Sequence, residues 1–340
     1  DTLTFVVNES GVSQVLNNGA ITNNGVIKVR KTIKASNGWG FVSFPFNVAA
    51  DKIFIAGTST PATWGDLTDD GKDFYVAEYD AASRAAGNFN ATNSPNWISV
   101  TPHVLVANKG YIMAIDNDIT LDFISSTGEA DLFETSAQVS VAKHPAVFPS
   151  NQDWNLIGVP FASSYELANA SAEHAPYYCH NGATYSTVMP EDTYEASPFT
   201  AFFLQAYGAP EVVSFASNGR LVKAATVKDF SEIALVVKNA KYSDMTRIRL
   251  QEGASAAYEL GKDAVKFFSN KLGVPQIASK LGALALSVNS VPANTTQVEV
   301  TVTITEDGTY TISLDGAAEG CSQVILVDGE VETDLLANEY

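Results

Sequence analysis

The densest group of side chains that could do chemistry comprises Glu173, His174, Cys179 and His180. A zinc site needs three or four such ligands in a tetrahedral arrangement, and the spacing in this group matches no common zinc pattern. A thiol nucleophile paired with the adjacent histidine is also disfavoured, because neighbouring residues on a strand point to opposite faces. We therefore interpret the segment as a loop and a strand, and predict neither metal-binding nor catalytic residues.

Acidic side chains could supply other chemistry, but their pattern is uninformative. A glycosidase needs two carboxyl groups that face each other at about 5 to 10 Å. Glu191, Asp192 and Glu195 could provide them, but on a protein of net charge −18 their presence says little. The segments 69–73 (Asp-Asp-Gly-Lys-Asp) and 116–118 (Asp-Asn-Asp) offer oxygen ligands for Ca²⁺. Neither has the EF-hand spacing, and Asx-rich turns explain both. We predict no cofactor, with a structural Ca²⁺ as the open alternative.

Aromatic side chains are the candidates for recognition. A row of exposed rings could stack on sugar rings. The candidates for it are Tyr75, Tyr79, Tyr185 and Tyr194 and, as the four that we select, Trp64, Trp97, Tyr177 and Tyr178. Trp39 and Trp154 occupy matched positions in two similar stretches, and we expect both in the core. Core packing is the competing interpretation for Trp64, Trp97, Tyr177 and Tyr178 as well.

Composition favours some classes of protein over others. The chain is 46% apolar and only 17% charged, which suits a β-rich secreted or surface-displayed protein. Residues 110–219 carry 1 basic and 13 acidic residues, so a nucleic-acid partner is disfavoured because a phosphate backbone needs a basic surface. No segment reaches the roughly 18 to 20 apolar residues needed to span a membrane. The chain begins at Asp1, and we expect any signal peptide to have been removed.

Two stretches of the chain repeat one another, Trp39–Phe46 and Trp154–Phe161. In each, Trp is followed six positions later by Pro-Phe, with an apolar pair and a small residue between. Short runs with strand character, separated by turns rich in Asn, Asp and Gly, dominate both regions. Two Asn-Asn-Gly triplets before residue 26 fit either hairpin turns or the edge of a β-solenoid.

The later strands of the two regions also align without gaps. This alignment places Tyr111 on Phe203 and Phe123 on Phe215. We therefore predict an internal duplication within one β-sandwich, with halves at about 36–135 and 136–222.

A second region begins near residue 223. Alternation from Val298 to Ile304 and the turn at 306–308 predict a hairpin, and some eight strands predict a jelly-roll-like sandwich. The one plausible helix spans Ala256–Ser269. Residues 220–280 carry 11 basic and 6 acidic residues, which leaves a weak case for anion binding. Cys179 and Cys321 are far apart, and we expect two unpaired thiols.

Several of these motifs occur together in a known group of proteins. They are Trp39–Phe46, Lys109-Gly110-Tyr111, Asn155–Gly158 before Pro160-Phe161, and Ala201-Phe202-Phe203. The series resembles that of secreted and cell-surface β-proteins of Bacteroidota, in which a Trp strand, a Gly-Tyr strand, a W-N-L-I-G-N-P strand and an A-F-F strand share one sandwich. Val159 stands where that family often has Asn, so any role of that Asn is absent.

The C-terminal region is similar to the sandwich that precedes the type IX secretion sorting tail in those proteins. The matching segments are Arg247–Leu250, Tyr258-Glu259, Gly261–Ala264, Lys266-Phe267, Leu284–Asn289, Gly308–Leu314 and Asp334–Leu336. The resemblance implies an extracellular or outer-surface module of a Gram-negative bacterium, of the type described as an adhesin, and it implies no catalytic residues. Because the family pattern continues past such a sandwich, we expect a longer natural chain.

Together these observations predict an all-β chain of two sandwiches, residues 1–222 with the duplication and residues 223–340. The expected function is non-catalytic adhesion or scaffolding through contact with a host or cell-surface protein or glycan. The alternative is a carbohydrate-binding module that uses exposed aromatic rings, and less favoured is an accessory part of a glycan-processing enzyme.

Overall fold

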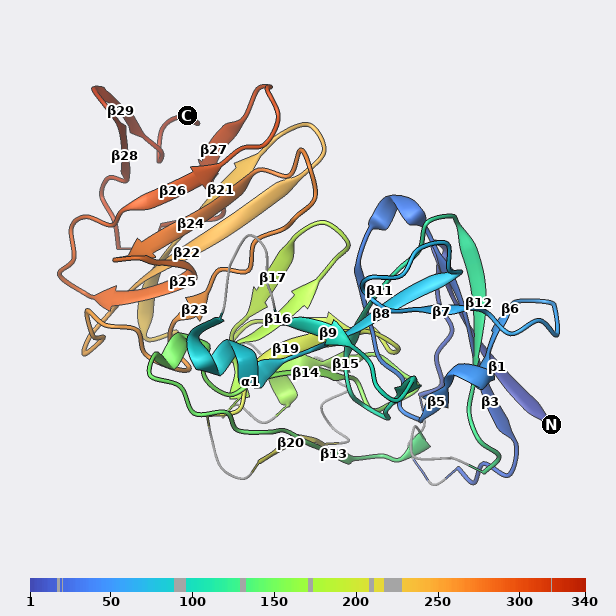
Figure 1. The fold of residues 1–340 in the computed structure, drawn as a ribbon. Helices are drawn as coiled ribbons and strands as arrows, with labels where there is room; N and C mark the ends of the chain where they lie inside the picture. The colour runs from blue at the N-terminus through green and yellow to red at the C-terminus, as the bar shows by residue number, and fades with distance from the viewer. Residues whose placement is uncertain are drawn as a thin grey trace. The chain divides into compact units, whose positions relative to one another are not determined.

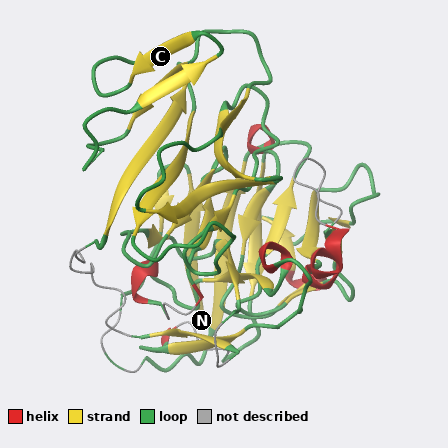
Figure 2. Ribbon diagram, turned by 90° about the vertical axis from the view of Figure 1, so that its left-hand side faces the viewer, coloured by secondary structure: helices red, strands yellow, loops and turns green. Residues whose placement is uncertain are grey.

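The computed structural model describes residues 1–16, 19, 21–88, 96–128, 133–170, 174–207, 211–216, 228–318 and 320–340. They form two compact units. Unit 1 comprises residues 1–182 and 188–224, and unit 2 comprises residues 183–187 and 225–340. Regular structure in both is almost entirely β-strand, and the helices are short turns (Figure 1, Figure 2). The all-β prediction is confirmed, whereas the expected boundary near residue 222 lies outside the described residues.

Unit 1 contains two halves, which we define as residues 1–128 and residues 133–182 with 188–216. The strands of the first half are β1 (Thr2–Asn8), β2 (Gly11–Val12), β3 (Val26–Ile33), β4 (Gly40–Val42), β5 (Val48–Ala49), β6 (Ile53–Ile55), β7 (Trp64–Gly65), β8 (Phe74–Tyr79), β9 (Trp97–Ser99), β10 (Val104–Leu105), β11 (Tyr111–Ala114) and β12 (Ile119–Ile124). Those of the second half are β13 (Ala137–Ser140), β14 (Trp154–Gly158), β15 (Tyr165–Glu166), β16 (Tyr177–His180), β18 (Glu195–Ala196), β19 (Ala201–Gln205) and β20 (Val212–Phe215). The short helices are α1 (Ala81–Ser83), η1 (Ala35–Asn37), η2 (Ala50–Lys52), η3 (Arg84–Asn88), η5 (Pro149–Asn151) and η6 (Leu167–Asn169).

The two halves pair their strands in the same order. In the first half, β3 pairs with β12, β4-β11-β8 are neighbours in one sheet, and β5 pairs with β10. In the second half, β13 pairs with β20, β14-β19-β16 are neighbours, and β15 pairs with β18. A 3-10 turn follows β5 and another follows β15, namely η2 and η6. Because β3 corresponds to β13, the first repeat begins before residue 36 and includes β3.

Strand register refines the alignment of the two halves. Phe41 lies opposite Ile112, and its counterpart Leu156 lies opposite Phe203, so Ile112 corresponds to Phe203. The alignment of Tyr111 on Phe203 is therefore wrong by one residue. Asn108 and Phe199 support the corrected offset, because both have the left-handed backbone, with φ of 62° and 63°.

The last strands keep the gapless alignment. Phe123 lies opposite Ile53, the residue that follows η2. Phe215 forms a β-bridge with Ala170, the residue that follows the corresponding turn η6. Phe123 thus corresponds to Phe215. The connection from β19 to β20 must therefore be one residue longer than that from β11 to β12, a difference that an ungapped comparison cannot register.

Corresponding residues of the two halves meet each other. A Cβ on Gly158 would lie 2.0 Å from Oγ of Ser43, its counterpart in the Trp-Pro-Phe repeat. A Cβ on Gly110 would lie 2.7 Å from Cβ of Ala201, its counterpart by the corrected register. A residue on a two-fold axis meets its own copy. The halves are therefore related by an approximate two-fold axis that passes near these positions.

The repeated tryptophans differ in burial, which corrects one expectation. Trp154 is fully buried, but Trp39 is 40% exposed. The connection that leads into β14 is longer than that into β4 and contains η5, where the carbonyl of Ser150 accepts a 3.0 Å hydrogen bond from Trp154 Nε1. The guanidinium group of Arg84 lies over the Trp154 ring, with its carbon 3.9 Å from the ring centroid. The shorter first connection, which contains only η1, leaves Trp39 exposed.

Unit 2 has one large sheet. Its strands are β21 (Phe230–Lys238), β22 (Ser243–Gln251), β23 (Ala264–Val265), β24 (Gln276–Leu281), β25 (Leu284–Pro292), β26 (Val300–Thr303) and β27 (Thr311–Leu314), with a hairpin of β28 (Ile325–Asp328) and β29 (Val331–Asp334); β17 (Tyr185–Val188) lies where the sequence returns to unit 1. The sheet order is β26-β24-β25-β22-β21-β27, and β22 and β25 run parallel. The hairpin predicted across residues 306–308 is wrong, because β26 pairs with β24 and β27 pairs with β21, at opposite edges of the sheet.

Polar groups fill part of the interior of unit 2. Lys266 and Asp244, both nearly inaccessible, form an ion pair of 2.6 Å. Burial lowers the pKa of Lys266 although Asp244 opposes this shift. The helix expected over Ala256–Ser269 is absent, because the segment forms turns and the two-residue strand β23. Gly261, with φ of 80°, breaks any helical run there.

Candidate functional site

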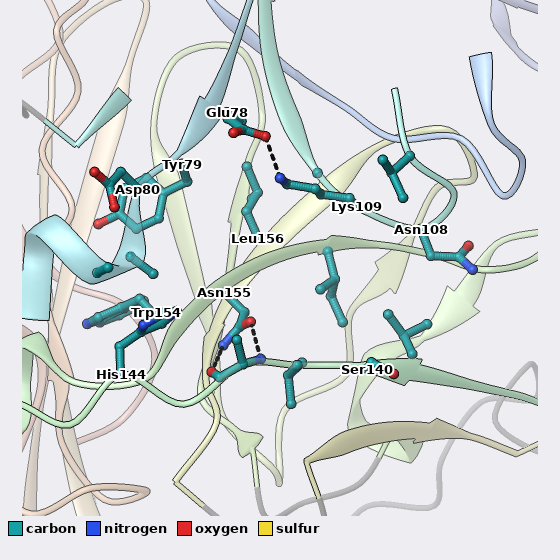
Figure 3. A pocket seen from close by; sticks show the side chains of 18 of the residues that line it. Glu78, Tyr79, Asp80, Asn108, Lys109, Ser140, His144, Trp154, Asn155 and Leu156 are labelled. Atoms are coloured by element: carbon teal, nitrogen blue, oxygen red, sulfur yellow. Dashed lines mark hydrogen bonds and ion pairs between the residues drawn. The ribbon is translucent and has the colours of Figure 1, made fainter. Parts of the chain in front are cut away.

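A cleft of about 700 Å³ lies in unit 1 and is lined by both halves (Figure 3). The first half contributes residues 78–82, Ile98 and residues 106–110. The second half contributes residues 138–142, His144 and residues 154–157. Its volume lies within the range typical of ligand sites, and its lining mixes charged, amide and aliphatic groups.

One wall of the cleft is the segment 106–110, docked on β14. Gly110 N donates to Leu156 O at 2.8 Å, and Gly158 N donates to Asn108 O at 2.9 Å. Gly110 permits this approach because a Cβ there would lie 2.5 Å from Leu156 Cγ. The outer edge of β14 is thus occupied by the first half. Asn108 Oδ1 is buried in this wall and has no partner among the described residues.

The charged groups of the lining are already paired. Glu78 and Lys109 form a close ion pair, drawn as a dashed line in Figure 3. The carboxylate of Asp80 accepts a 2.9 Å hydrogen bond from Ser83 N at the start of α1. Both carboxylates of the lining are therefore held by neighbouring groups, and the lining also includes the imidazole of His144.

An arginine supports the aromatic side of the cleft. Arg84 is fully buried, donates to Tyr79 Oη at 3.0 Å and Ser150 O at 3.2 Å, and lies over the Trp154 ring. Burial raises the pKa of Tyr79, while Arg84 opposes the shift. Tyr79 and Trp154 line the cleft, and their rings are fixed by this cation and by edge contacts with Phe203.

Asn155 joins the two sheets of the second half at the cleft. Its Oδ1 accepts from Ala142 N and its Nδ2 donates to Ala142 O, each at 2.8 Å. The amide therefore contacts the backbone just beyond β13 as a paired strand would. Figure 3 shows Asn155 between β14 and the chain that leads from Ser140.

The predicted aromatic row does not form. Trp64 is 7% exposed and stacks on His103, with ring centroids 5.0 Å apart. Tyr177 and Tyr178 are each 1% exposed, against Phe202 and Trp154 respectively. Side chains this deeply buried cannot stack on a ligand from solvent, so for these three residues the core interpretation holds.

Trp97 is the exception among the predicted aromatics, because it is only partly buried. Its ring contacts Tyr79 at 5.1 Å, and Tyr79 lines the cleft. Trp97 and Tyr178 thus each contact a ring that lines the cleft, but the structure brings none of the four together as an exposed surface.

The His and Cys cluster is likewise dispersed into the fold, and Glu173 lies outside the described residues. Nε2 of His174 contacts Val212 O at 3.0 Å, and His180 packs on Phe41. Burial raises the pKa of the Cys179 thiol to about 12, so it is not ionised at neutral pH. Both cysteines are unpaired, as predicted. Among the described residues, no three His, Cys, Asp or Glu side chains could hold a metal ion.

The other predicted acidic groups have partners within the protein, some in turns and others across the fold. Asp192 accepts from Met189 N at 2.9 Å, and Asp73 accepts from Thr63 N at 2.7 Å. Asp118 pairs with Lys34 at 2.9 Å, and Asp116 accepts from Tyr75 Oη at 2.7 Å. These contacts fit the interpretation of both Asp-rich segments as turns.

Sequence reasoning missed the residues that form the cleft, above all Glu78, Lys109 and Asn155. The one available signal was Asn155 itself, a polar residue where the first repeat has Gly40. No protein family, curated protein or solved structure matches the chain. Across the described residues, no helix has the length and apolar character to cross a membrane.

Proposed function

We propose that this chain is a non-catalytic binding module of a secreted or cell-surface protein, serving adhesion or scaffolding, and that the cleft of unit 1 is its contact site. The observation that carries the proposal is the pairing of the charged groups in the lining, Glu78 with Lys109 and Asp80 with Ser83 N. Groups held in this way provide fixed polar contacts, which suit binding.

The scaffold and the composition support the same proposal. Two half-sandwiches packed about an approximate two-fold axis supply the strands β8, β13 and β14, which form part of the cleft lining and support the loops that complete it. The low content of charged residues and the resemblance to Bacteroidota surface proteins favour an extracellular setting. The proposed partners are a host or cell-surface protein or a glycan.

The test asks whether binding depends on residues at the rim of the cleft. Beads coated with the chain are exposed to panels of immobilised extracellular-matrix proteins and glycans. Ile98 and Val106 are 41% and 49% exposed in the lining, so Val106→Arg should abolish retention on any surface that the unmodified protein binds. Val147→Arg is the matched control, because Val147 is 90% exposed and lies outside the lining.

Two results would overturn the proposal. One is retention by no surface in either panel. The other is turnover of chromogenic glycosides or esters that Glu78→Gln abolishes, which would make the cleft an active site.

A carbohydrate-binding role is the second candidate, favoured by one combination in the cleft. Tyr79 offers an aromatic ring, and Asn108 offers an amide whose Oδ1 lacks a partner among the described residues. Sugars are bound by such pairings of ring faces with hydrogen-bonding groups. A glycan array without hits would remove this candidate.

A further inference from the structure

β13 uses one of its two edges. Along that edge it pairs with β20, and Val141 N continues the ladder by donating to Glu211 O at 3.1 Å. In an antiparallel pair, alternate residues direct their backbone groups at the partner. The N–H and C=O groups of Gln138 and Ser140 therefore point away from β20, and no described residue pairs with them.

This open edge faces the cleft. Residues 138–142 all line it, whereas no residue of β20 does. Side chains alternate between the two faces of a strand, so a cavity over one face would be lined by every second residue. A cavity lined by five consecutive residues therefore lies along the edge of the strand. Ala142 lies two residues after Ser140, so its backbone groups point the same way as those of Ser140. The N and O of Ala142 are bonded by Asn155, which lines the cleft.

The first half shows what covers such an edge. β3 corresponds to β13, and its edge away from β12 is covered by β1, which runs parallel to it. Phe5 lies opposite Val29 and Val7 opposite Lys31, and both of these β1 side chains are buried. Among the described residues of the second half, no strand takes the place of β1.

We propose that the open edge of β13 binds an extended peptide of a partner protein, which joins the β13–β20 sheet as a third strand. The inference rests on the proposed function and names its partner class. Strand edges are usually protected by Lys or Pro, yet residues 137–142 contain neither. Main-chain hydrogen bonds supply affinity in such complexes, and alternate side chains supply specificity.

The surroundings define the chemistry of this peptide. By analogy with Phe5 and Val7, it carries apolar side chains at alternate positions. Because Asn155 already bonds Ala142, the open edge extends over residues 137–141, roughly 17 Å, which limits the paired segment to about five residues. A basic peptide is favoured, because Glu78 and Asp80 outnumber Lys109 in the lining and residues 110–219 carry 13 acidic residues against 1 basic.

The probe is a synthetic peptide with the sequence of β1, residues 2–8, between two lysines. We expect saturable binding to the full chain by titration calorimetry. Ser140→Pro removes one N–H of the open edge and should weaken binding at least about tenfold. Proline is tolerated where the N–H of an edge strand is unpaired, so the fold should survive. Ser140→Ala keeps the N–H and should change the affinity by less than about twofold.

Two further measurements do not depend on a variant that folds. The same peptide, N-methylated at alternate amides, should not bind, because it cannot form the ladder. Hydrogen exchange at Gln138 and Ser140 should slow when the unmodified peptide is added. Exchange at Val139 and Val141 should not change, because the backbone groups of these residues already point at β20.

Several outcomes would overturn the inference, and they can be told apart. If the N-methylated peptide binds equally well, the contact is not strand addition. If oligosaccharides but no peptides bind the cleft, the module recognises glycans, and the proposed function stands alone. If Ser140→Pro converts a dimer to a monomer and the peptide does not bind, a second copy occupies the edge. If no surface or peptide is bound, both proposals fail together.

Discussion

The two halves of unit 1 pair their strands alike but finish their outer sheets differently. In the first half, β1 covers the edge of β3, and the sheet extends to five strands, β2-β1-β3-β12-β6. In the second half, β13 and β20 stand as a pair, and the open edge of β13 borders the cleft. A repeated fold therefore does not imply a repeated surface. Strands added outside the repeat decide which backbone groups remain available.

The largest expected difference between the halves concerns the repeated tryptophans. Trp154→Ala removes a fully buried ring and should lower the free energy of unfolding by about 3 to 5 kcal/mol. Trp39→Ala removes a ring that is 40% exposed and should cost less than about 1 kcal/mol. Urea denaturation of both variants measures the two changes. Equal losses would mean that the halves bury their tryptophans alike.

A second test addresses the approximate two-fold axis. In Gly158→Ala the new methyl group would lie 2.0 Å from Ser43 Oγ, and such overpacking should cost about 1 to 3 kcal/mol. Adding Ser43→Gly should restore much of this loss. Gly40→Ala is the control, because a Cβ there meets nothing within 4 Å. Thermal unfolding would contradict the axis if the double variant were no more stable than Gly158→Ala.

A third test uses an ion pair that only one half has. Arg30 binds Asp122 with two hydrogen bonds of 2.7 and 2.8 Å, whereas Gln138 and Ser214 occupy the corresponding positions. Arg30→Gln should lower the free energy of unfolding by about 1.5 to 3 kcal/mol, the contribution of hydrogen bonds to charged groups. Gln138→Ala should cost less than about 0.5 kcal/mol.

The same pair makes the stability of the first half sensitive to acid. Burial raises the pKa of Asp122, but Arg30 and Lys28 outweigh it, so the folded pKa lies below the ordinary value of 3.8. The stabilisation by this carboxylate is therefore complete above pH 3.8 or so and lost as the pH falls through the folded pKa. The stability difference between the unmodified protein and Arg30→Gln should shrink in that acidic range. A difference independent of pH would exclude the ion pair as its cause.

The smallest expected effect concerns the left-handed residues that the halves share. Asn108→Ala should cost about 1 kcal/mol, because alanine adopts a φ of 62° less readily than Asn. Asn108→Gly should cost less than Asn108→Ala, since glycine accepts this conformation. Denaturant unfolding of the two variants gives the comparison. The reverse order would mean that the side chain, and not the backbone angle, matters at this position.

Local patterns predicted much of this fold. Alternation and turn residues predicted the β-strand character of both regions, and the Trp-Pro-Phe repeat indicated the duplication whose pairing order the structure repeats. They could not predict the exposure of Trp39, because that depends on what a neighbouring connection covers. They misplaced Tyr111 because one residue is inserted between later strands.

The cleft was beyond such reasoning for a different reason. Glu78, Lys109 and Asn155 are far apart in the sequence, and each is an ordinary polar residue of a β-rich chain. Only the docking of segment 106–110 on β14 brings them to one place. The absence of a partner strand for β13 is likewise a property of pairing and not of composition.

The contact between Ser43 and Gly158 also bears on what joining two copies in one chain allows. In a symmetric dimer, a position on the axis carries the same residue twice, so any side chain there must tolerate its own image. A fused chain changes one copy at a time. The hydroxymethyl side chain of Ser43 can then pack against Gly158, which has no side chain. Two identical subunits could not combine serine and glycine at this position. The same freedom lets one half keep its covering strand while the other half does without.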